Sequence, residues 1–245
     1  MRAEPSHRSE QVSQLLFGEL CEVTEVAKEF SKVRCRYDGY EGWCQSIQLD
    51  KIAQPEEGFS NEILTKDGTS EISLNGAPMV IPMGSSLAAF QNRTEFQKHT
   101  LSFRGKSLNP QQSRFNEGTI TSVARKYLNT AYLWGGRSPF GVDCSGFTQM
   151  VFKFLNVFLY RDAYQQATQG DTVGFLQEAR CGDVAFFDND EGKIIHTGIL
   201  LNNSSIIHAS GKVRIDSIDY TGILNAETQR HTHKLRIIKR YARLE

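Results

Sequence analysis

The sequence predicts an α+β fold in which two small β barrels precede a domain where helices pack on an antiparallel sheet. In the first half of the chain, short apolar or alternating runs are separated by turn dipeptides such as Asp38-Gly39 and Asn75-Gly76, a pattern typical of small β domains. After Phe115 the apolar spacing becomes that of helices, and strand-like runs return further on. Helices followed by strands favour an α+β domain with an antiparallel sheet.

The first half divides into two strand-rich segments. Strands are expected at 14–17, 20–23, 32–35 and 41–44, and then at 71–74, 79–82 and 86–90. A Pro-Glu-Glu-Gly run at 55–58 resembles a joint between the two sets. We therefore expect one barrel over residues 1–54 and a second over residues 55–115.

The second half contains helices and then strands. Residues 119–129 place apolar side chains on one helix face, and a second helix is expected over 145–155. Strands are expected at 183–187, 194–201, 205–209 and 234–238. These elements predict a third domain over residues 116–245.

The charge balance excludes several functional classes. Lys plus Arg and Asp plus Glu each number 28, so the net charge is zero, and hydrophobic residues make up 39%. A neutral chain gives no electrostatic reason to expect a nucleic acid partner. No apolar run approaches the roughly 20 residues of a membrane-spanning helix. We therefore expect a folded protein with no nucleic acid partner and no membrane span.

One cysteine differs from the others in its setting. The chain has five cysteines and no CxxC pair, which argues against a disulfide framework and against a zinc ribbon. Cys144 follows a glycine-rich loop and opens the second predicted helix, with Asp143 as the expected N-cap. The N–H groups and partial positive charge of a helix N-terminus favour a thiolate and can stabilise an oxyanion. The sequence therefore predicts a nucleophile at Cys144, and a structural cysteine in a turn is the weaker interpretation.

A thiol nucleophile needs a base, and two histidines lie on neighbouring predicted strands. A three-residue turn at 201–203 would pair His196 with His208 on one face of the sheet. A two-residue turn at 202–203 would pair His196 with Ala209 and put the two histidines on opposite faces. The sequence leaves this register open. The chemistry favours the first, with one imidazole as base and the other fixing its tautomer.

Four segments stand in a specific order in this half of the chain. They are YLWGG at 132–136, DCSGF at 143–147, HTGI at 196–199 and HAS at 208–210. Together they resemble the NlpC family of papain-like bacterial cell-wall cysteine peptidases, over about residues 117–240. This resemblance implies a papain-like domain in which Cys144 is the nucleophile, His196 the base and His208 the residue that orients the base.

The same resemblance implies the surroundings of the nucleophile. Tyr132 is expected to help the oxyanion site, and Asp143 and Ser145 to flank the cysteine. The sequence has Thr197 where the family often has valine, a difference without chemical consequence.

A narrower resemblance concerns YRDAYQQ at 160–166. This segment looks like that of a subgroup which cleaves γ-D-glutamyl-diamino acid bonds in murein peptides and carries bacterial SH3-like domains ahead of the catalytic one. It implies that Asp162 binds the free amine of an N-terminal L-alanine, helped by a tyrosine and a glutamate of the first SH3-like domain. Ala163 stands where the subgroup usually has serine, so one hydrogen bond of that site is missing.

Further substrate-binding residues follow from this comparison. Tyr40 is the candidate tyrosine, although an ordinary barrel aromatic is nearly as good an interpretation. Glu4 is the candidate glutamate, with Glu10 as the alternative. Trp134 and Arg161 complete the expected set. A closed pocket for an ammonium group needs a carboxylate and hydrogen-bond acceptors, and it would exclude stem peptides whose alanine is acylated on the glycan.

The predicted function is therefore a cysteine endopeptidase acting on the murein stem peptide L-Ala-γ-D-Glu-diamino acid, in cell-wall peptide turnover or recycling. The alternative is an acyl or amide transferase, or a cell-wall-binding module, on the same scaffold. No cofactor is expected, because thiol catalysis needs none. His231 and His233 are interpreted as surface residues, since a metal site there would lack a third ligand.

The resemblance also bears on domains and compartment. Residues 1–54 are expected to form a first SH3-like domain that lacks its first strand, residues 55–115 a second, and residues 116–245 the peptidase domain. A missing first strand implies a chain that begins further upstream with an export signal. This favours an exported or periplasmic location over a cytoplasmic one, and the sequence makes no prediction of the oligomeric state.

Overall fold

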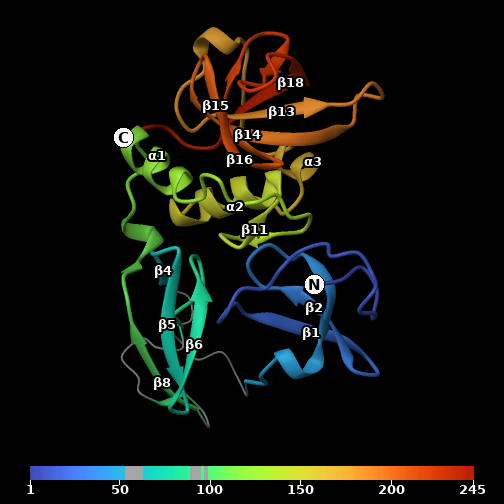
Figure 1. Ribbon diagram of the computed structural model, residues 1–245, viewed down its shortest axis with the longest axis vertical. Coiled ribbons are helices and arrows are strands. Elements are labelled where there is room, and N and C mark those ends of the chain that lie inside the picture. Colours follow the sequence, from blue (N-terminus) through green and yellow to red (C-terminus); the bar gives the residue numbers. More distant parts are fainter. Residues whose placement is uncertain (53–62, 89–94, 97–98) are drawn as a thin grey trace. The chain divides into compact units, whose positions relative to one another are not determined.

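The computed structural model divides the chain into two compact units (Figure 1). The structure describes residues 1–52, 63–88, 95–96 and 99–245. The first unit comprises Met1–Gln112 and Arg137–Pro139, and the second comprises Ser113–Gly136 and Phe140–Glu245. The expected joint at 55–58, and with it the boundary between the two expected barrels, lies outside the described residues, as does the end of the expected strand at 86–90.

The first unit is built from antiparallel strands. Its first sheet has the order β1-β2-β3, formed by β1 (Cys21–Ala27), β2 (Phe30–Cys35) and β3 (Glu41–Gln45). The following strands are β4 (Leu64–Thr65), β5 (Thr69–Leu74), β6 (Ala77–Pro82), β7 (Glu95–Phe96), β8 (His99–Arg104) and β9 (Ser107–Leu108). Of these, β4 pairs with β9, and the others form a sheet of order β6-β5-β8-β7. The 3-10 helices η1 (Ser46–Gln48) and η3 (Pro110–Gln112) follow the two groups of strands.

The expected strand at 14–17 is not formed, because this segment binds a buried arginine instead. Arg137 donates from its backbone N–H to Gln14 Oε1 at 2.7 Å and from Nη1 to the Gln14 carbonyl oxygen at 2.8 Å. Its guanidinium also pairs with Glu19, with Nη1 2.9 Å from Oε2 in an almost fully buried ion pair. That residues 55–115 form a second SH3-like domain stays a prediction.

The second unit combines helices with one large sheet. Its helices are α1 (Glu117–Arg125), α2 (Cys144–Phe154) and α3 (Ala163–Gln166), with the 3-10 helix η4 (Leu176–Glu178). Its strands are β11 (Gly141–Val142), β12 (Asp171–Val173), β13 (Val184–Asp188), β14 (Ile194–Asn202), β15 (Ser205–Ser210), β16 (Lys212–Ile218), β17 (Gly222–Leu224) and β18 (His231–Arg240). The short β10 (Arg137–Ser138) belongs by its residues to the first unit.

The large sheet closes on itself. Its order is β12-β18-β13-β14-β15-β16-β17, and β17 also pairs with β18, so six antiparallel strands form a barrel. Apolar side chains that point inward fill it, among them Ala185, Phe187, Leu200, Ile206 and Ile218. The sequence prediction contained neither β16 nor β17, although β16 alternates apolar and polar residues as a strand does.

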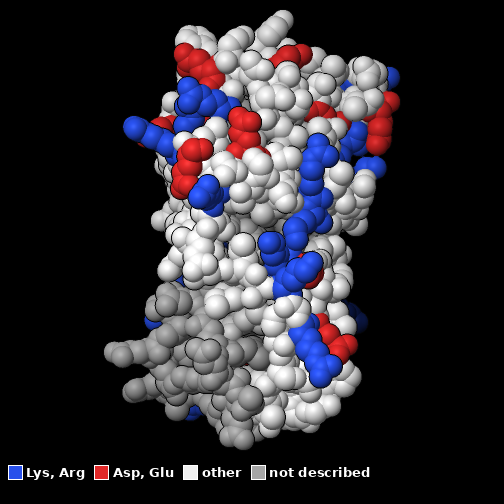
Figure 2. All heavy atoms as spheres, turned by 90° about the vertical axis from the view of Figure 1, so that its left-hand side faces the viewer, with Lys and Arg blue, Asp and Glu red and all other residues white. Residues whose placement is uncertain are grey.

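Helix α2 lies against the barrel strands that carry the predicted histidines. All of its residues are buried, and it packs on β14 and β15, with α1 beside it (Figure 1). The N-terminus of this helix is the position of Cys144. Within the described ranges no helix is both long and apolar enough to cross a lipid bilayer. On the surface seen in Figure 2, acidic and basic side chains lie interspersed over the upper part, which belongs to this unit.

Candidate active site

Asp143 holds the start of α2, where Cys144 is the first helical residue. The carboxylate accepts the backbone N–H of Gly146 at 2.6 Å and that of Gly135 at 2.8 Å. The first bond is the N-cap that the sequence predicts. The second ties the preceding glycine loop to the same carboxylate, so one side chain fixes both sides of the cysteine.

Arg161, which is only 1% exposed, bonds the carboxylate of Asp143. Its Nη1 and Nη2 atoms are 3.0 and 2.6 Å from the two oxygens of Asp143, and Nη1 is 2.9 Å from Ser145 Oγ. A bidentate pair of this kind fixes both partners in position. The sequence prediction placed Arg161 among the substrate-binding residues. Its burial and its bonds correct this, because they direct the guanidinium at Asp143.

Burial dominates the pKa of the nucleophile candidate. Cys144 is 7% exposed, and burial, together with the nearby Asp143 carboxylate, raises the pKa of its thiol to about 12. Hydrogen bonds with the backbone of Thr197 and Ser145, and the charge of Arg161, lower that pKa but do not reverse the shift. This direction is opposite to the lowered pKa that a helix N-terminus favours, and burial is its largest cause.

The candidate base, His196, is buried next to the strand residue whose backbone contacts the Cys144 sulfur. His196 lies on β14 directly before Thr197, whose backbone bonds the Cys144 sulfur. Its Nε2 atom is 2.9 Å from Nδ1 of His208 on β15. Burial, reinforced by His208 and His233, holds the pKa of His196 well below its usual value. A neutral imidazole can therefore accept a proton.

The two histidines share a face, although neither predicted register is formed. Gly198 pairs with His208, and a bulge between Leu200 and Asn202 shifts the ladder. His196 is two residues before Gly198, so its side chain points to the same face as that of His208. A Cβ atom on Gly198 would lie 2.7 Å from His208 Cβ. Glycine therefore leaves the gap in which the two rings meet.

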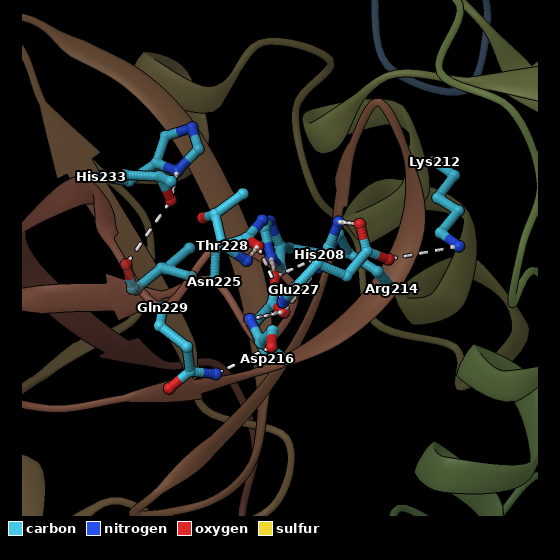
Figure 3. A network of polar contacts seen from close by, with 12 residues as sticks. His208, Lys212, Arg214, Asp216, Asn225, Glu227, Thr228, Gln229 and His233 are labelled. Carbon is cyan, nitrogen blue, oxygen red and sulfur yellow. Dashed lines mark hydrogen bonds and ion pairs between the residues drawn. The ribbon is translucent and has the colours of Figure 1, made fainter.

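The sequence prediction missed a carboxylate, that of Asp216, which is hydrogen-bonded to His208 (Figure 3). Nε2 of His208 is 2.9 Å from Oδ2 of Asp216 on β16. Arg214 donates from Nε and Nη2 to the two oxygens of Asp216, at 2.8 and 3.1 Å, and from Nη1 to Glu227 at 3.2 Å. Burial would raise the pKa of Asp216, but hydrogen bonds from His208, Arg214 and the Ala226 amide hold it below its usual range.

A third imidazole covers the candidate base. The rings of His233 and His196 are stacked with centroids 4.0 Å apart and an interplanar angle of 23°. Burial and the neighbouring His208 lower the pKa of His233 to about 4, against the opposing charge of Asp216. The interpretation of His233 as a surface residue is wrong, whereas His231 is exposed and pairs with Asp219. In the described part of the chain, no group of three or more His, Cys, Asp or Glu residues is arranged to hold a metal.

The remaining predicted residues of the second unit differ in exposure. Tyr132 is half-buried, and burial together with the Cys144 thiol raises its pKa, which places it beside the nucleophile. Trp134 is 59% exposed. Asp162 is half-buried and is the N-cap residue of α3, where its backbone N–H donates to Gln165 Oε1 at 3.2 Å.

Two predicted substrate residues belong to the first unit. Tyr40 is half-buried in the turn before β3, and its backbone N–H donates to Asp38 Oδ1 at 3.0 Å. Glu4 is exposed, as is the alternative Glu10. The roles of these three residues stay predictions.

Comparison with known proteins gives two family matches. The model of the NlpC/P60 family matches residues 129–233, and that of the bacterial dipeptidyl-peptidase SH3 domain matches residues 1–49. The chain is 30% identical over 214 residues to the gamma-D-glutamyl-L-lysine dipeptidyl-peptidase of Bacillus subtilis (strain 168), covering 80% of this chain and 71% of that protein. It is 26% identical over 256 residues to the dipeptidyl-peptidase 6 of Lysinibacillus sphaericus, covering 89% and 88%.

Two further matches cover different shares of the chain. A crystal structure of an NlpC/P60 family protein from Bacillus cereus ATCC 10987 superimposes with a TM-score of 0.80 at 20% identity, over 94% of this chain and 82% of that one. The probable endopeptidase p60 of Listeria seeligeri is 39% identical over 104 residues, 42% of this chain and 20% of that protein. The superposition and the NlpC/P60 family model confirm the papain-like fold, and the SH3 family model over residues 1–49 confirms an SH3-like domain at the start of the chain.

Proposed function

The chain belongs to the NlpC/P60 family, and on that premise we propose that it is a cysteine endopeptidase of murein stem peptides, which hydrolyses the γ-D-glutamyl-diamino acid bond. The observation that carries the proposal is the buried Cys144 beside the strand of His196, whose ring is linked to His208 at 2.9 Å. A relative named gamma-D-glutamyl-L-lysine dipeptidyl-peptidase supports the substrate class.

The acylation step uses the neutral thiol and the neutral imidazole together. The Cys144 sulfur attacks the γ-carbonyl carbon of the D-glutamyl residue while its proton passes to His196. Backbone N–H groups at the start of α2 and the hydroxyl of Tyr132 are the donors proposed for the developing oxyanion. The carbon–nitrogen bond then breaks, and the proton on His196 passes to the amine of the departing diamino acid.

The deacylation step reuses the same base. Water attacks the thioester on Cys144 and gives its proton to His196. The carbon–sulfur bond breaks, the thiol is restored, and L-Ala-D-Glu leaves. An amine in place of water would complete a transfer reaction by the same path, which is why transfer is the alternative outcome.

The preference for a free N-terminus is the finer part of the proposal. Asp162, half-buried at the start of α3, is the carboxylate proposed to bind the ammonium group of L-alanine. Tyr40 and Glu4 of the first unit remain the candidates proposed to assist it.

The test of the peptidase is release of L-Ala-D-Glu from L-Ala-γ-D-Glu-diaminopimelate. We expect the wild-type protein to release it and Cys144→Ala to release none. Cys181→Ala is the matched control, because Cys181 is also buried in the same unit and its sulfur contacts Thr121. Release by Cys144→Ala, or none by the wild type, would refute the proposal.

Two further experiments test the amine site and the choice between hydrolysis and transfer. Acetylation of the alanine amine should abolish turnover, and Asp162→Asn should raise KM for the free peptide. Equal rates with the acetylated peptide would reject the amine site and leave the peptidase intact. With added glycinamide, a preponderance of the glycinamide adduct over the free dipeptide would identify a transferase.

A further inference from the structure

We propose that Asp216 is a positioning residue that fixes the tautomers of His208 and His196, so that His196 presents an unprotonated Nδ1 atom to the nucleophile. The inference deepens the proposed function and rests on it for the roles of Cys144 and His196. It uses a carboxylate that is hydrogen-bonded to His208 and lies on a different strand from either histidine.

The first step concerns the proton on His208. Asp216 is 3% exposed, and its carboxylate accepts bonds from Arg214, from the Ala226 amide and from Nε2 of His208 (Figure 3). An ionised carboxylate only accepts hydrogen bonds, so Nε2 of His208 must carry the proton. Arg214 already balances the charge of Asp216, so a second buried cation on His208 would lack compensation. The proposed arrangement therefore has a neutral His208 with a lone pair on Nδ1.

The second step transfers this constraint to the base. Nδ1 of His208 is 2.9 Å from Nε2 of His196, and it can only accept. Nε2 of His196 therefore carries the proton, and its Nδ1 keeps the lone pair. This is the atom that can take the thiol proton, because Nε2 is occupied by the bond to His208. When His196 becomes positively charged, the same chain of bonds leads to the negative charge of Asp216.

The third step concerns the rigidity of the chain of bonds. His208 pairs with Arg214 and Ile206 pairs with Asp216 in the β15–β16 ladder, so Asp216 is the diagonal neighbour of His208 on one face of the sheet. His208 is 1% exposed and the Asp216 side chain is fully buried. Arg214 donates to both oxygens of Asp216 and also donates to Glu227, which fixes the guanidinium in place. The carboxylate therefore has one orientation available.

The substitution Asp216→Asn reverses the tautomers. If the amide oxygen faced His208, the amide NH₂ would point at the Ala226 N–H and Arg214 Nη2, which are two donors. If the amide NH₂ faces His208, only Arg214 Nε opposes it. The second orientation has fewer conflicts, so the NH₂ donates to His208 Nε2, and Nδ1 of His208 must then carry the proton. His196 in turn is forced to hold its proton on Nδ1.

The direct test is 15N NMR of the imidazoles, which distinguishes the two tautomers without any substrate. We expect Nε2–H on His196 and His208 in the wild type, and Nδ1–H on His208 in Asp216→Asn. Asp219→Asn is the matched control, because Asp219 bonds a histidine at 2.9 Å on the surface of the same unit, and it should change neither ring. An Nδ1–H tautomer of His196 in the wild type would overturn the inference, whatever the variants do.

The kinetic test separates positioning from support of the fold. A reversed tautomer in the serine-protease triad lowers kcat by about 10⁴ with geometry intact, and we expect Asp216→Asn to lower kcat by at least about 100-fold with KM nearly unchanged. In a His208→Gln background the glutamine oxygen accepts from His196 whichever residue stands at 216. Asp216→Asn should then change kcat less than about threefold. If Asp216→Asn lowered kcat by the same factor in both backgrounds, Asp216 would have only a structural role.

These outcomes are independent of the proposed substrate. Wild-type protein that shows the expected tautomers but releases no L-Ala-D-Glu would refute the proposed function and retain the inference. Turnover with the opposite tautomers would do the reverse.

Discussion

Replacing Arg161 with methionine tests the buried support of the nucleophile. The substitution removes two bonds to Asp143, of 3.0 and 2.6 Å, and leaves that carboxylate, 6% exposed, with backbone amides and one hydroxyl as donors. Removing one partner of a buried ion pair costs about 3–5 kcal/mol. Against a typical stability of about 5–15 kcal/mol, that is a large share of the free energy of unfolding. With about 2–4 °C per kcal/mol, Tm should fall by roughly 6–20 °C.

Urea and thermal unfolding followed by circular dichroism measure this change, and two controls define its cause. The double variant Asp143→Asn/Arg161→Met should be more stable than Arg161→Met, because a neutral amide is cheaper to bury and still caps a helix. Arg34→Met breaks an exposed pair with Glu41, so it should lower the free energy of unfolding far less than Arg161→Met does. A loss below about 1 kcal/mol for Arg161→Met, or a double variant less stable than the single one, would refute this reasoning.

Two more predictions follow from the site. Gly198→Ala places a methyl group 2.7 Å from His208 Cβ, so we expect the free energy of unfolding to fall by about 1–3 kcal/mol and kcat to fall at least tenfold. Gly118→Ala in α1, whose new methyl group would have its nearest contact at 3.5 Å, should raise the free energy of unfolding by up to about 1 kcal/mol and leave kcat unchanged. Identical behaviour of the two variants would contradict the steric argument. Because burial raises the pKa of Cys144 to about 12 and the thiolate is the reactive form, alkylation of Cys144 by iodoacetamide should accelerate about tenfold per pH unit from pH 6 to 9. A plateau with a midpoint below pH 8, absent in Cys144→Ala, would instead indicate a preformed thiolate–imidazolium pair.

Local chemistry explains which parts of the site were predictable from the sequence. Asp143 and Cys144 are adjacent residues at a helix start, so the cap bond to Gly146 follows from the sequence order alone. His196 and His208 stand on consecutive strands, so a shared face was one of the two outcomes that the sequence left open, and the structure reaches it through a register that neither turn gave.

Properties that depend on distant contacts were not predictable in the same way. The bulge between Leu200 and Asn202 is one extra residue in a ladder, which no turn rule specified. Asp216 is a diagonal neighbour of His208 only once β15 and β16 are paired. The raised pKa of Cys144 depends mainly on how completely the unit covers the sulfur, and the order of residues along the chain does not give that burial.

The polar chain of His196, His208 and Asp216 in the barrel links burial to the proposed catalysis. His196, His208 and Asp216 point to the same side of the sheet as the apolar core residues Leu200 and Ile206, where an unmatched donor or acceptor is costly. Each of their buried hydrogen bonds therefore favours the fold, and the one proton arrangement that satisfies all of them is also the arrangement that a thiol requires of its base. In the proposed mechanism the Cys144 thiol passes its proton to His196 only as the sulfur attacks the substrate carbonyl, which requires the unprotonated nitrogen that this arrangement leaves on the base.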